Sequence, residues 1–462
     1  MDFEQLDESA RIEFVRKTVR NFLGSSRMEN AKECRDYYKT ENPDIAKRRK
    51  LYAAPYERED GTMAAVAKEN RFAANEKIAS PSFRKIVDTK VQYLAGEGVD
   101  ITALDEADAP TVKAIVDVLG ADQLRRVMQE DLTEALVYQS GYAYFQLINN
   151  KPRLKCFPFC ELIPSYDGED NLKNMMRYYK RDGIEHFDYH TAEKIYSFSR
   201  NPKARNGSGW KFDGECWQIT TGKRYPDGTV EDTGGKGWPR LPWFELFHND
   251  DHCSSLTHSV KTMIRCYDIV LSDFVNNLID LQDVFVSLKA DSAYSGMDAG
   301  EVIEMLKNFK VAEGVENVQA FEVPHVARQV LLDILKAGIY EGLQGVDVKQ
   351  LTGGQKTATE IKAVYSDIDL WANQAEWHIK DWVSDILEFM AESMGVALPP
   401  VKITCQRRVM FDEVAQMQAV ASQKGVISDK TLFENHPLVP DAQVELERVA
   451  AQEVDPAYSG DL

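Results

Sequence analysis

No run of apolar residues in this sequence of 462 residues approaches the roughly 18 that a membrane-spanning helix needs. The first residues, Met1 to Gln5, lack the basic stretch and the apolar core of a secretion signal. We therefore expect a protein that has no contact with a membrane, is not secreted and stays in the cytoplasm of the cell that makes it.

Cysteines are few, and their number is odd: seven are scattered along the chain at irregular spacing. A disulfide framework typically shows an even number of cysteines in a secreted chain. The sequence therefore predicts reduced thiols.

Basic residues are outnumbered, with 55 lysines and arginines against 74 aspartates and glutamates and a net charge of −19. A protein that clamps nucleic acid needs a basic face, so this class is disfavoured. DNA that must pass nearby without sticking remains compatible with the charge. The apolar fraction of 44% predicts a globular chain, and the length allows two to four domains.

Catalytic motifs are also missing: Gly-x-Ser-x-Gly, His-Glu-x-x-His and Gly-x-Gly-x-x-Gly do not occur. The segment 353–357 (GGQKT) lacks the glycine that a phosphate loop has directly before its lysine, because Gln355 intervenes. We expect it to be a loop in front of a helix, and the sequence gives no argument for catalysis or a cofactor.

One histidine-rich stretch raises the question of a metal site, with His248, His252, Cys253 and His258 within eleven residues. Structural zinc sites usually combine two matched pairs of ligands at short spacing. Cys156 and Cys160 could supply a second pair, but nothing in the sequence places them nearby. We therefore expect ordinary junction residues and no metal.

The N-terminal half has the patterns of an α+β domain. Residues 1 to about 60 look helical and polar and end in a charged loop around 47–50 (KRRK). A helix is expected after Pro81, capped by Ser80, with apolar residues at helical spacing up to Leu94. A further helix over about 121–138 leads into a strand at 141–147, and short strands separated by Asp-Gly and Asn-Gly turns follow to about 247.

The pattern changes at about residue 256. One apolar stripe with steps of four and three predicts a helix of about 25 residues. Apolar residues also lie off this stripe, so a second face is expected to meet protein. A short interruption follows, and then a second helix over about 326–342. The stripe comprises Val260, Ile264, Tyr267, Leu271, Phe274, Leu278 and Leu281.

A glycine-bearing loop over 345–356 contains Lys349, Gln350 and Lys356. A long helix is expected to begin at Thr357, which with Glu360 fits a capping box, and to end near Gly395. A short strand over 401–405 and a helical, acidic tail follow. Two long helices around a small excursion cannot bury both of their faces within one subunit, so copies of the chain arranged in a ring would cover the second face.

Several segments carry a resemblance to a known family. They are 75–79 (NEKIA) with 83–96 (FRKIVDTKVQYLAG), 140–144 (SGYAY), 176–179 (MRYY), 357–361 (TATEI), and 425–428 (GVIS) with 437–441 (PLVPD) and 445–448 (ELER). Together with the order of elements, they resemble the portal proteins of tailed double-stranded DNA bacteriophages, in particular long-tailed phages of Gram-positive hosts. One junction departs from the pattern, because Leu241-Pro242-Trp243 replaces the proline-isoleucine entry expected before the first long helix.

The resemblance implies a portal fold with an α/β wing, a two-helix stem, a small α/β clip, a tunnel loop, a long wing helix and a helical crown. The implied boundaries are 1–255 for the N-terminal wing, 256–282 and 326–344 for the stem helices, 283–325 for the clip, 345–356 for the tunnel loop, 357–405 for the long wing helix and strand, and 406–462 for the crown and tail. In this arrangement the apolar stripe of the first stem helix would form a subunit interface.

The resemblance also implies a function. About twelve subunits would form a ring at one capsid vertex, through which double-stranded DNA passes without sequence specificity. Expected partners are the terminase large subunit, head-completion adaptor proteins, and the major capsid and scaffolding proteins. We expect the DNA in the channel to be contacted by Lys349, Gln350 and Lys356 of the loop and by Arg328 and Lys336 of the second stem helix.

Two other classes of function remain open from the residues alone. The acidic β region could belong to a metal-dependent hydrolase or nuclease, which would be active as a monomer. A passive scaffold or adaptor protein would assemble through its helices but would have no open channel. The portal interpretation predicts a structural, non-enzymatic protein of the virion.

Overall fold

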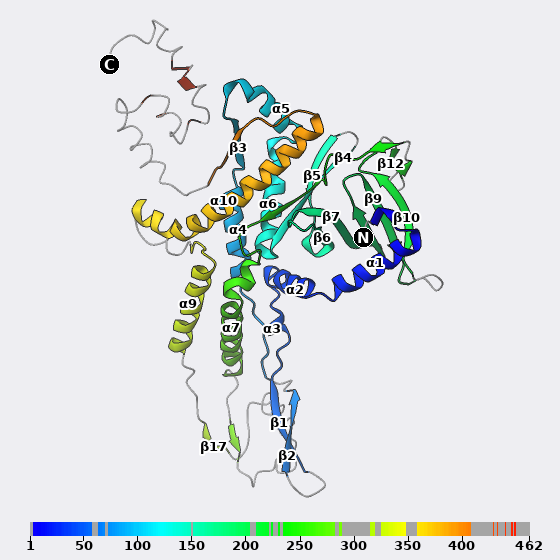
Figure 1. The fold of residues 1–462 in the computed structure, drawn as a ribbon. Coiled ribbons are helices and arrows are strands. Elements are labelled where there is room, and N and C mark those ends of the chain that lie inside the picture. The colour runs from blue at the N-terminus through cyan, green and yellow to red at the C-terminus, as the bar shows by residue number, and fades with distance from the viewer. Residues whose placement is uncertain are drawn as a thin grey trace, which may run out of the picture. The chain divides into compact units, whose positions relative to one another are not determined.

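The computed structural model describes residues 3–57, 63–69, 73–148, 151–203, 209–220, 223–224, 230–231, 234–281, 286–288, 315–318, 325–347 and 358–407, with a few isolated residues beyond. The chain divides into two compact units, Met1–Val346 with Asp367–Arg407, and Asp347–Ser366 with Arg408–Leu462. In the second unit, the described part is mainly the first turns of the long helix α10. All the contacts below lie within the first unit, shown in Figure 1.

The N-terminal segment begins with three helices, each capped by a side chain. Asp7, Ser25 and Asn42 accept hydrogen bonds from backbone N–H groups in the first turns that follow them. These helices are α1 (Glu8–Leu23), α2 (Ser26–Tyr38) and α3 (Pro43–Ala46), preceded by the short 3-10 helix η1 (Phe3–Gln5).

An antiparallel hairpin follows, formed by β1 (Leu51–Glu57) and β2 (Met63–Glu69), with Leu51 opposite Glu69. The prediction that the chain is helical up to about residue 60 was therefore wrong for residues 51–57, which form β1. The physical reason is the alanine-rich composition of the hairpin, which favours helix locally and contains few of the β-branched residues typical of strands. The pairing of the two strands decides the structure here.

Helix α4 (Ser82–Ala95) confirms the helix expected after Pro81, but not its cap. Pro81 itself occupies the N-cap position, without a side-chain hydrogen bond. The backbone N–H of Ser80 donates instead to Asp268 Oδ1 at 2.9 Å, although the two residues are 188 positions apart in the sequence. A long-range contact thus replaces the local cap.

The expected α+β character is confirmed, with two antiparallel sheets and two helices beside them. Helices α5 (Ala109–Leu119) and α6 (Ala121–Val137) precede a three-stranded sheet in the order β15-β4-β5, and a five-stranded sheet has the order β10-β9-β8-β7-β6. The strands are β4 (Ser140–Ile148), β5 (Lys151–Cys156), β6 (Leu162–Tyr166), β7 (Leu172–Arg181), β8 (Ile184–His190), β9 (Lys194–Arg200), β10 (Lys211–Trp217) and β15 (Trp243–Phe247).

Smaller elements complete this part. Strand β3 (Val99–Ala103) pairs with β18 (Val401–Cys405), which joins the end of the long helix to the N-terminal part. The remaining short elements are η2 (Glu106–Asp108), η3 (Phe159–Glu161), β11 (Ile219–Thr220), β12 (Lys223–Arg224), β13 (Val230–Glu231) and β14 (Gly235–Lys236).

Two aromatic clusters form the core of the α+β part. One joins α1 to the five-stranded sheet, where the ring of Phe3 stacks on Tyr189 at a centroid distance of 4.0 Å. The other joins α2 to the three-stranded sheet around Tyr144 and Trp243, whose rings stack at 4.7 Å. Burial of such large side chains is the main source of stability.

The long helices lie where the apolar stripes predicted them. A π-helical turn η4 (Leu256–Val260) leads into α7 (Lys261–Leu281), and α9 (His325–Gly342) and α10 (Ala358–Met394) follow. Strands β16 (Val286–Leu288) and β17 (Val315–Val318) pair between α7 and α9. The expected small helix at 299–308, the cap at Thr357 and most of the C-terminal tail lie outside the described residues.

Helix α6 crosses strand β4 at a glycine. A Cβ atom at Gly141 would lie 2.2 Å from the backbone oxygen of Asp131, so only glycine allows this approach. The helix–strand contact therefore depends on one residue of the segment SGYAY.

We predict that Gly141→Ala destabilises the fold by about 3 kcal/mol, because the new methyl group must push two backbone segments apart. Urea unfolding measures the difference. Gly168→Ala is the matched control, since a Cβ there meets nothing within 4 Å. Equal stability of Gly141→Ala and the native protein would contradict the close approach.

The side chain of Asp131 is completely buried beneath the same strand, near the thiol of Cys156. Within the described chain, no N–H or O–H group donates a hydrogen bond to its carboxyl oxygens. Removal from water therefore raises the pKa of Asp131 well above its usual value. The carboxyl group binds its proton more tightly in the fold than in the unfolded chain.

A raised folded-state pKa contributes stability that is fully present below the unfolded pKa of about 3.9 and is lost as the pH rises through the folded value. We predict that Asp131→Asn, which cannot ionise, loses less stability between pH 4.5 and pH 8 than the native protein. Thermal unfolding at both pH values measures this. The control is Asp122→Asn, exposed on the same helix; an unchanged pH dependence in Asp131→Asn would count against a protonated carboxyl.

Candidate functional site: the helix pair and its N-terminal strap

Helices α7 and α9 pack side by side in antiparallel directions (Figure 1). At one end, a Cβ at Gly342 would lie 2.8 Å from Val260 Cγ1, so glycine permits the approach. At the other end, the guanidinium group of Arg328 lies over the ring of Phe274 at 5.8 Å. Residue 260, the last of η4, is thus level with 342 of α9, and residue 274 of α7 is level with 328.

The structure places the predicted interface stripe of α7 mostly against α9 of the same chain. Val260 and Ile264 are completely buried, and the following three stripe residues are half-buried. Leu278 is 48% exposed. A role of this stripe between subunits stays a prediction, and among the stripe residues whose burial is described, Leu278 has the most surface available for it.

The predicted channel residues divide into two groups. Arg328 and Lys336 lie on α9 with their charged ends over aromatic rings, Lys336 Nζ being 5.3 Å from the ring centre of Tyr340. Lys349, Gln350 and Lys356 lie outside the described residues. A DNA contact by any of the five stays a prediction.

A polar column on a different side of α7 holds the N-terminal segment. Its first member, Asp268, is 1% exposed and accepts hydrogen bonds from Asn42 Nδ2 at 2.8 Å and from the backbone N–H of Ser80 at 2.9 Å. Burial raises the pKa of Asp268, while both hydrogen bonds favour the ionised form. One carboxyl group thus joins the start of α3, the start of α4 and α7.

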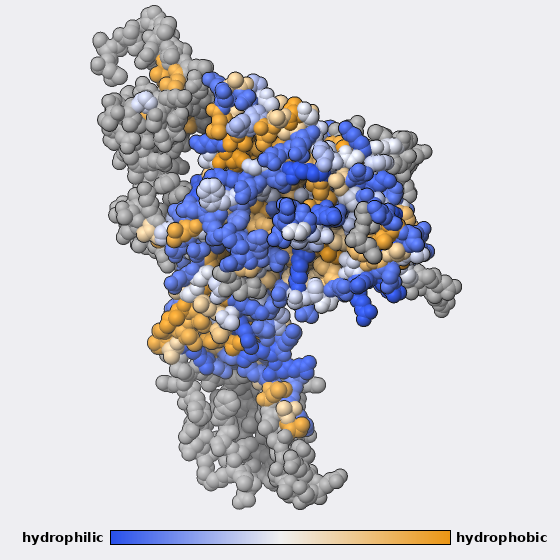
Figure 2. All heavy atoms as spheres, in the orientation of Figure 1, coloured by the Kyte–Doolittle hydropathy of each residue, from blue (hydrophilic) through white to orange (hydrophobic). Residues whose placement is uncertain are grey.

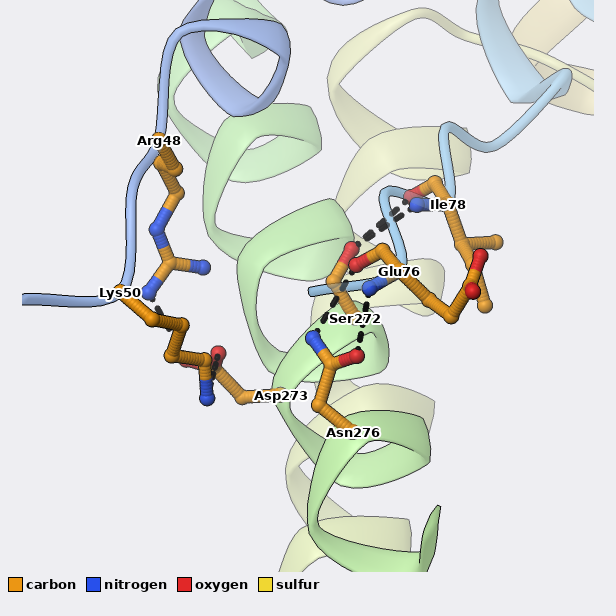
Figure 3. A network of polar contacts seen from close by, with 7 residues as sticks. All are labelled: Arg48, Lys50, Glu76, Ile78, Ser272, Asp273 and Asn276. Atoms are coloured by element: carbon orange, nitrogen blue, oxygen red, sulfur yellow. Dashed lines mark hydrogen bonds and ion pairs between the residues drawn. The ribbon is translucent and has the colours of Figure 1, made fainter. Parts of the chain in front are cut away.

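The next two members bind an extended segment, residues 73–80, which we call the strap (Figure 3). Asn276 pairs with both backbone groups of Glu76: its Oδ1 accepts at 2.6 Å and its Nδ2 donates at 3.0 Å. Ser272 does the same for Ile78, accepting from the N–H at 3.0 Å and donating to the carbonyl oxygen at 3.4 Å. The two side chains therefore replace the partner strand that an extended backbone needs.

The segment that enters the hairpin β1–β2 is bound to the same helix (Figure 3). Arg48 Nη2 lies 3.0 Å from Asp273 Oδ2, and Lys50 Nζ lies 4.0 Å from Asp273 Oδ1. These groups are partly exposed, so each ion pair contributes little stability. Their geometric effect is larger, because both ends of the hairpin are now fixed on α7.

The polar column could have been found in the sequence. Asp268, Ser272 and Asn276 follow each other at steps of four, which places them on one side of a helix. The apolar stripe predicted a contact only for the other side of the same helix. The identity of their partner, a segment about 200 residues earlier in the chain, carried no sequence signal.

Helix α9 has a second apolar face that no described residue covers. Val326, Val330 and Ile334 are 64%, 52% and 62% exposed and lie at steps of four, on the side away from α7. Ile339, further along α9, is completely buried. Figure 2 shows apolar side chains gathered over α9, one of several apolar areas on this face of the molecule.

The histidine-rich junction forms a turn. Asn249 Nδ2 donates to the carbonyl oxygen of Cys253 at 3.1 Å, and His248 Nε2 lies 2.9 Å from the same oxygen. Burial lowers the pKa of His248 to about 3, so the ring is neutral. Within the described ranges, no three potential ligands come together to hold a metal, and no helix is long and apolar enough to span a membrane.

We predict that Asn276→Ala frees the strap, because two backbone groups of Glu76 lose their partners, at a cost of about 1 kcal/mol. Hydrogen exchange at the amide of Glu76 should become faster, while the secondary structure is unchanged. Asn277→Ala on the same helix is the matched control. Unchanged exchange in Asn276→Ala would show that the strap is held by other contacts.

Comparison with known proteins gives the family. Residues 25–455 match the model of the phage portal protein family, SPP1 Gp6-like. The portal protein of Bacillus phage SPP1 is 26% identical over 445 residues, covering 89% of this chain and 81% of the relative. The portal protein of Clostridium phage phiCD119 is 23% identical over 455 residues, covering 90% and 96%.

Among solved structures, the neck of an empty gene transfer agent particle is similar over 77% of this chain and 88% of that chain. Its TM-score of 0.38 and identity of 10% are too low to support the assignment, which follows from the family match alone. The chain belongs to the SPP1 Gp6-like family of phage portal proteins, the non-enzymatic virion components that assemble into an oligomeric ring and form the channel for DNA packaging and ejection at one capsid vertex.

Proposed function

We propose that α7 and α9 are the two stem helices of the portal subunit, with boundaries near 256–282 and 326–344. Residues 283–325 would form the clip, 345–356 the tunnel loop, and 406–462 the crown and tail. The wing would comprise residues 1–255 and 357–405. The observation that carries this assignment is α9, a helix with apolar residues on two sides, of which the described residues cover one.

We propose further that the tunnel loop provides the contacts to double-stranded DNA. A ring of about twelve subunits carries roughly −230, about twelve times the −19 of one chain, and such a wall repels phosphate groups. Against this background, Lys349 and Lys356 would add rings of weak, sequence-independent contacts, with Gln350 as a neutral donor between them. DNA could then slide through the channel and still be retained by many small interactions.

Arg328 and Lys336 would contribute less than the loop lysines to the contacts with DNA. Their charged ends lie over the rings of Phe274 and Tyr340, and such contacts hold a cation close to its own helix pair. We propose that they set the potential of the stem wall, while the loop lysines contact the DNA backbone.

The partners follow from the assigned subdomains. The clip would bind the terminase large subunit during packaging and the head-completion adaptor proteins afterwards. The wing and crown would face the major capsid and scaffolding proteins. These assignments rest on the family and on the order of elements in the chain.

We predict that Lys349→Glu combined with Lys356→Glu reduces DNA packaging or retention, because two attractive rings become repulsive. Packaged DNA protected from nuclease measures the effect, and negative-stain electron microscopy confirms that rings still form. The control, Lys32→Glu with Lys113→Glu, makes the same change of charge at exposed lysines of α2 and α5. Packaging equal to that of the control would exclude the lysine contacts and leave the portal assignment intact.

A further inference from the structure

We propose that neighbouring subunits join through the apolar face of α9 on one copy and the strap flank of the next copy. The strap flank is the surface formed by residues 45–51, the end of β2 and the strap 73–80. This inference rests on the proposed function, because it requires α7 and α9 to stand in the wall of a ring. It assigns a defined interface to a surface that the described residues of one chain leave exposed.

The two faces lie on different sides of the helix pair. The face of α9 that carries Val330 points away from α7, while the strap binds α7 through Ser272 and Asn276. Figure 1 shows α9, α7 and α3 in that order across the view, and contacts join α9 to α7 and α7 to α3. A subunit therefore presents one of these faces to each of its two neighbours, as a closed ring of heterologous contacts requires.

The two faces are also level with each other along α7. The strap and residues 48–50 are bound to the stretch of α7 between Asp268 and Asn276. Because residue 274 of α7 is level with Arg328 of α9, this stretch corresponds to about 326–334, which holds Val326, Val330 and Ile334. Rotation of one copy around a ring axis brings faces at the same level together, without a shift along the wall.

The apolar parts of the two faces match in character. Leu51 at the base of the hairpin is 59% exposed and belongs to the strap flank. A large apolar residue with this much exposed surface is expected at a protein–protein contact when it meets other apolar side chains. Val326, Val330 and Ile334 would provide the complementary apolar surface, so that these three side chains and Leu51 are removed from water together.

The charges of the two faces are opposite. On the strap flank, the exposed basic residues Lys47, Arg49, Lys68 and Lys77 outnumber the exposed acidic residues Glu69 and Glu76, in a chain that is strongly acidic overall. Asp333 and Glu341 are exposed beside the apolar stripe of α9. Two copies that met through identical faces would place like charges together, whereas α9 against the strap flank pairs acidic with basic groups. A second copy of this chain is therefore the occupant that the surfaces favour.

A cross-linking experiment tests the contact directly. Val330→Cys and Lys77→Cys are combined in one chain, with the exposed Cys266 replaced by serine. The two new thiols lie on different sides of the helix pair, so bonds between them must join neighbouring subunits. After mild oxidation of assembled rings, we expect a ladder of covalent oligomers in denaturing, non-reducing gels.

The control combines Lys77→Cys with Leu104→Cys, which is 68% exposed near β3, and should give no ladder. Negative-stain electron microscopy of the same samples separates the possible failures. Rings without a ladder in the Val330→Cys variant would overturn the interface while the portal assignment stands. The absence of rings from the unmodified protein would contradict the proposed ring itself.

Reversal of charge provides a second, independent measurement. Arg49→Glu alone and Asp333→Lys alone should each lower the fraction of chains in rings several-fold, measured by native mass at fixed protein concentration. The two changes together restore opposite charges across every contact and should recover much of the loss. Losses that simply add in the double variant would show that these residues do not face each other.

Discussion

Helix α7 must satisfy two neighbours of different chemistry at once, and the arrangement of the stem region depends on how it does so. On one side it buries Val260 and Ile264 against α9. On another, the carboxyl group of Asp268 and the side chains of Ser272 and Asn276 bind backbone groups of an extended segment. Unpaired backbone N–H and C=O groups would be costly at this surface, so the column fixes the position of the strap along the helix.

This constraint also determines where the hairpin β1–β2 lies. A two-stranded hairpin in isolation is marginally stable, and its position would be undefined if only one end were attached. Here Asp273 holds Arg48 and Lys50 before β1, and Asn276 holds Glu76 after β2. The hairpin therefore has a definite position relative to α7, which a surface shared between copies requires.

Periodic patterns in the sequence predicted the helices well, because one buried face determines each of them. The stripe from Val260 to Leu278 located α7, and the aromatic strand at 141–147 located β4. Contacts between distant segments were not predictable in this way. Ser80 has the chemistry of a helix cap, yet its N–H donates to Asp268, and the alanine-rich hairpin has little strand propensity of its own.

The function itself was predictable to the level of the family, since its motifs are distributed over nearly the whole chain. Because the chain belongs to this family, it is a portal protein. The metal-dependent hydrolase and the passive scaffold, which the residues alone left open, are thereby excluded. The contact between subunits was harder to predict from the sequence, because an apolar stripe on a helix can be covered either by the same chain or by another copy. The stripe of α7 is largely covered by α9, while the outer face of α9 is uncovered among the described residues.

The acidic charge of the chain explains why the exposed apolar face of α9 is needed. Subunits with a net charge of −19 repel each other at long range, so general electrostatic attraction cannot assemble a ring. Apolar contact acts only at short range and is not weakened by salt, while physiological salt screens the repulsion beyond about 8 Å. A few basic residues next to that contact, such as Lys47, Arg49 and Lys77, are then sufficient to select one face of the neighbour over the other without making the whole wall attractive to DNA.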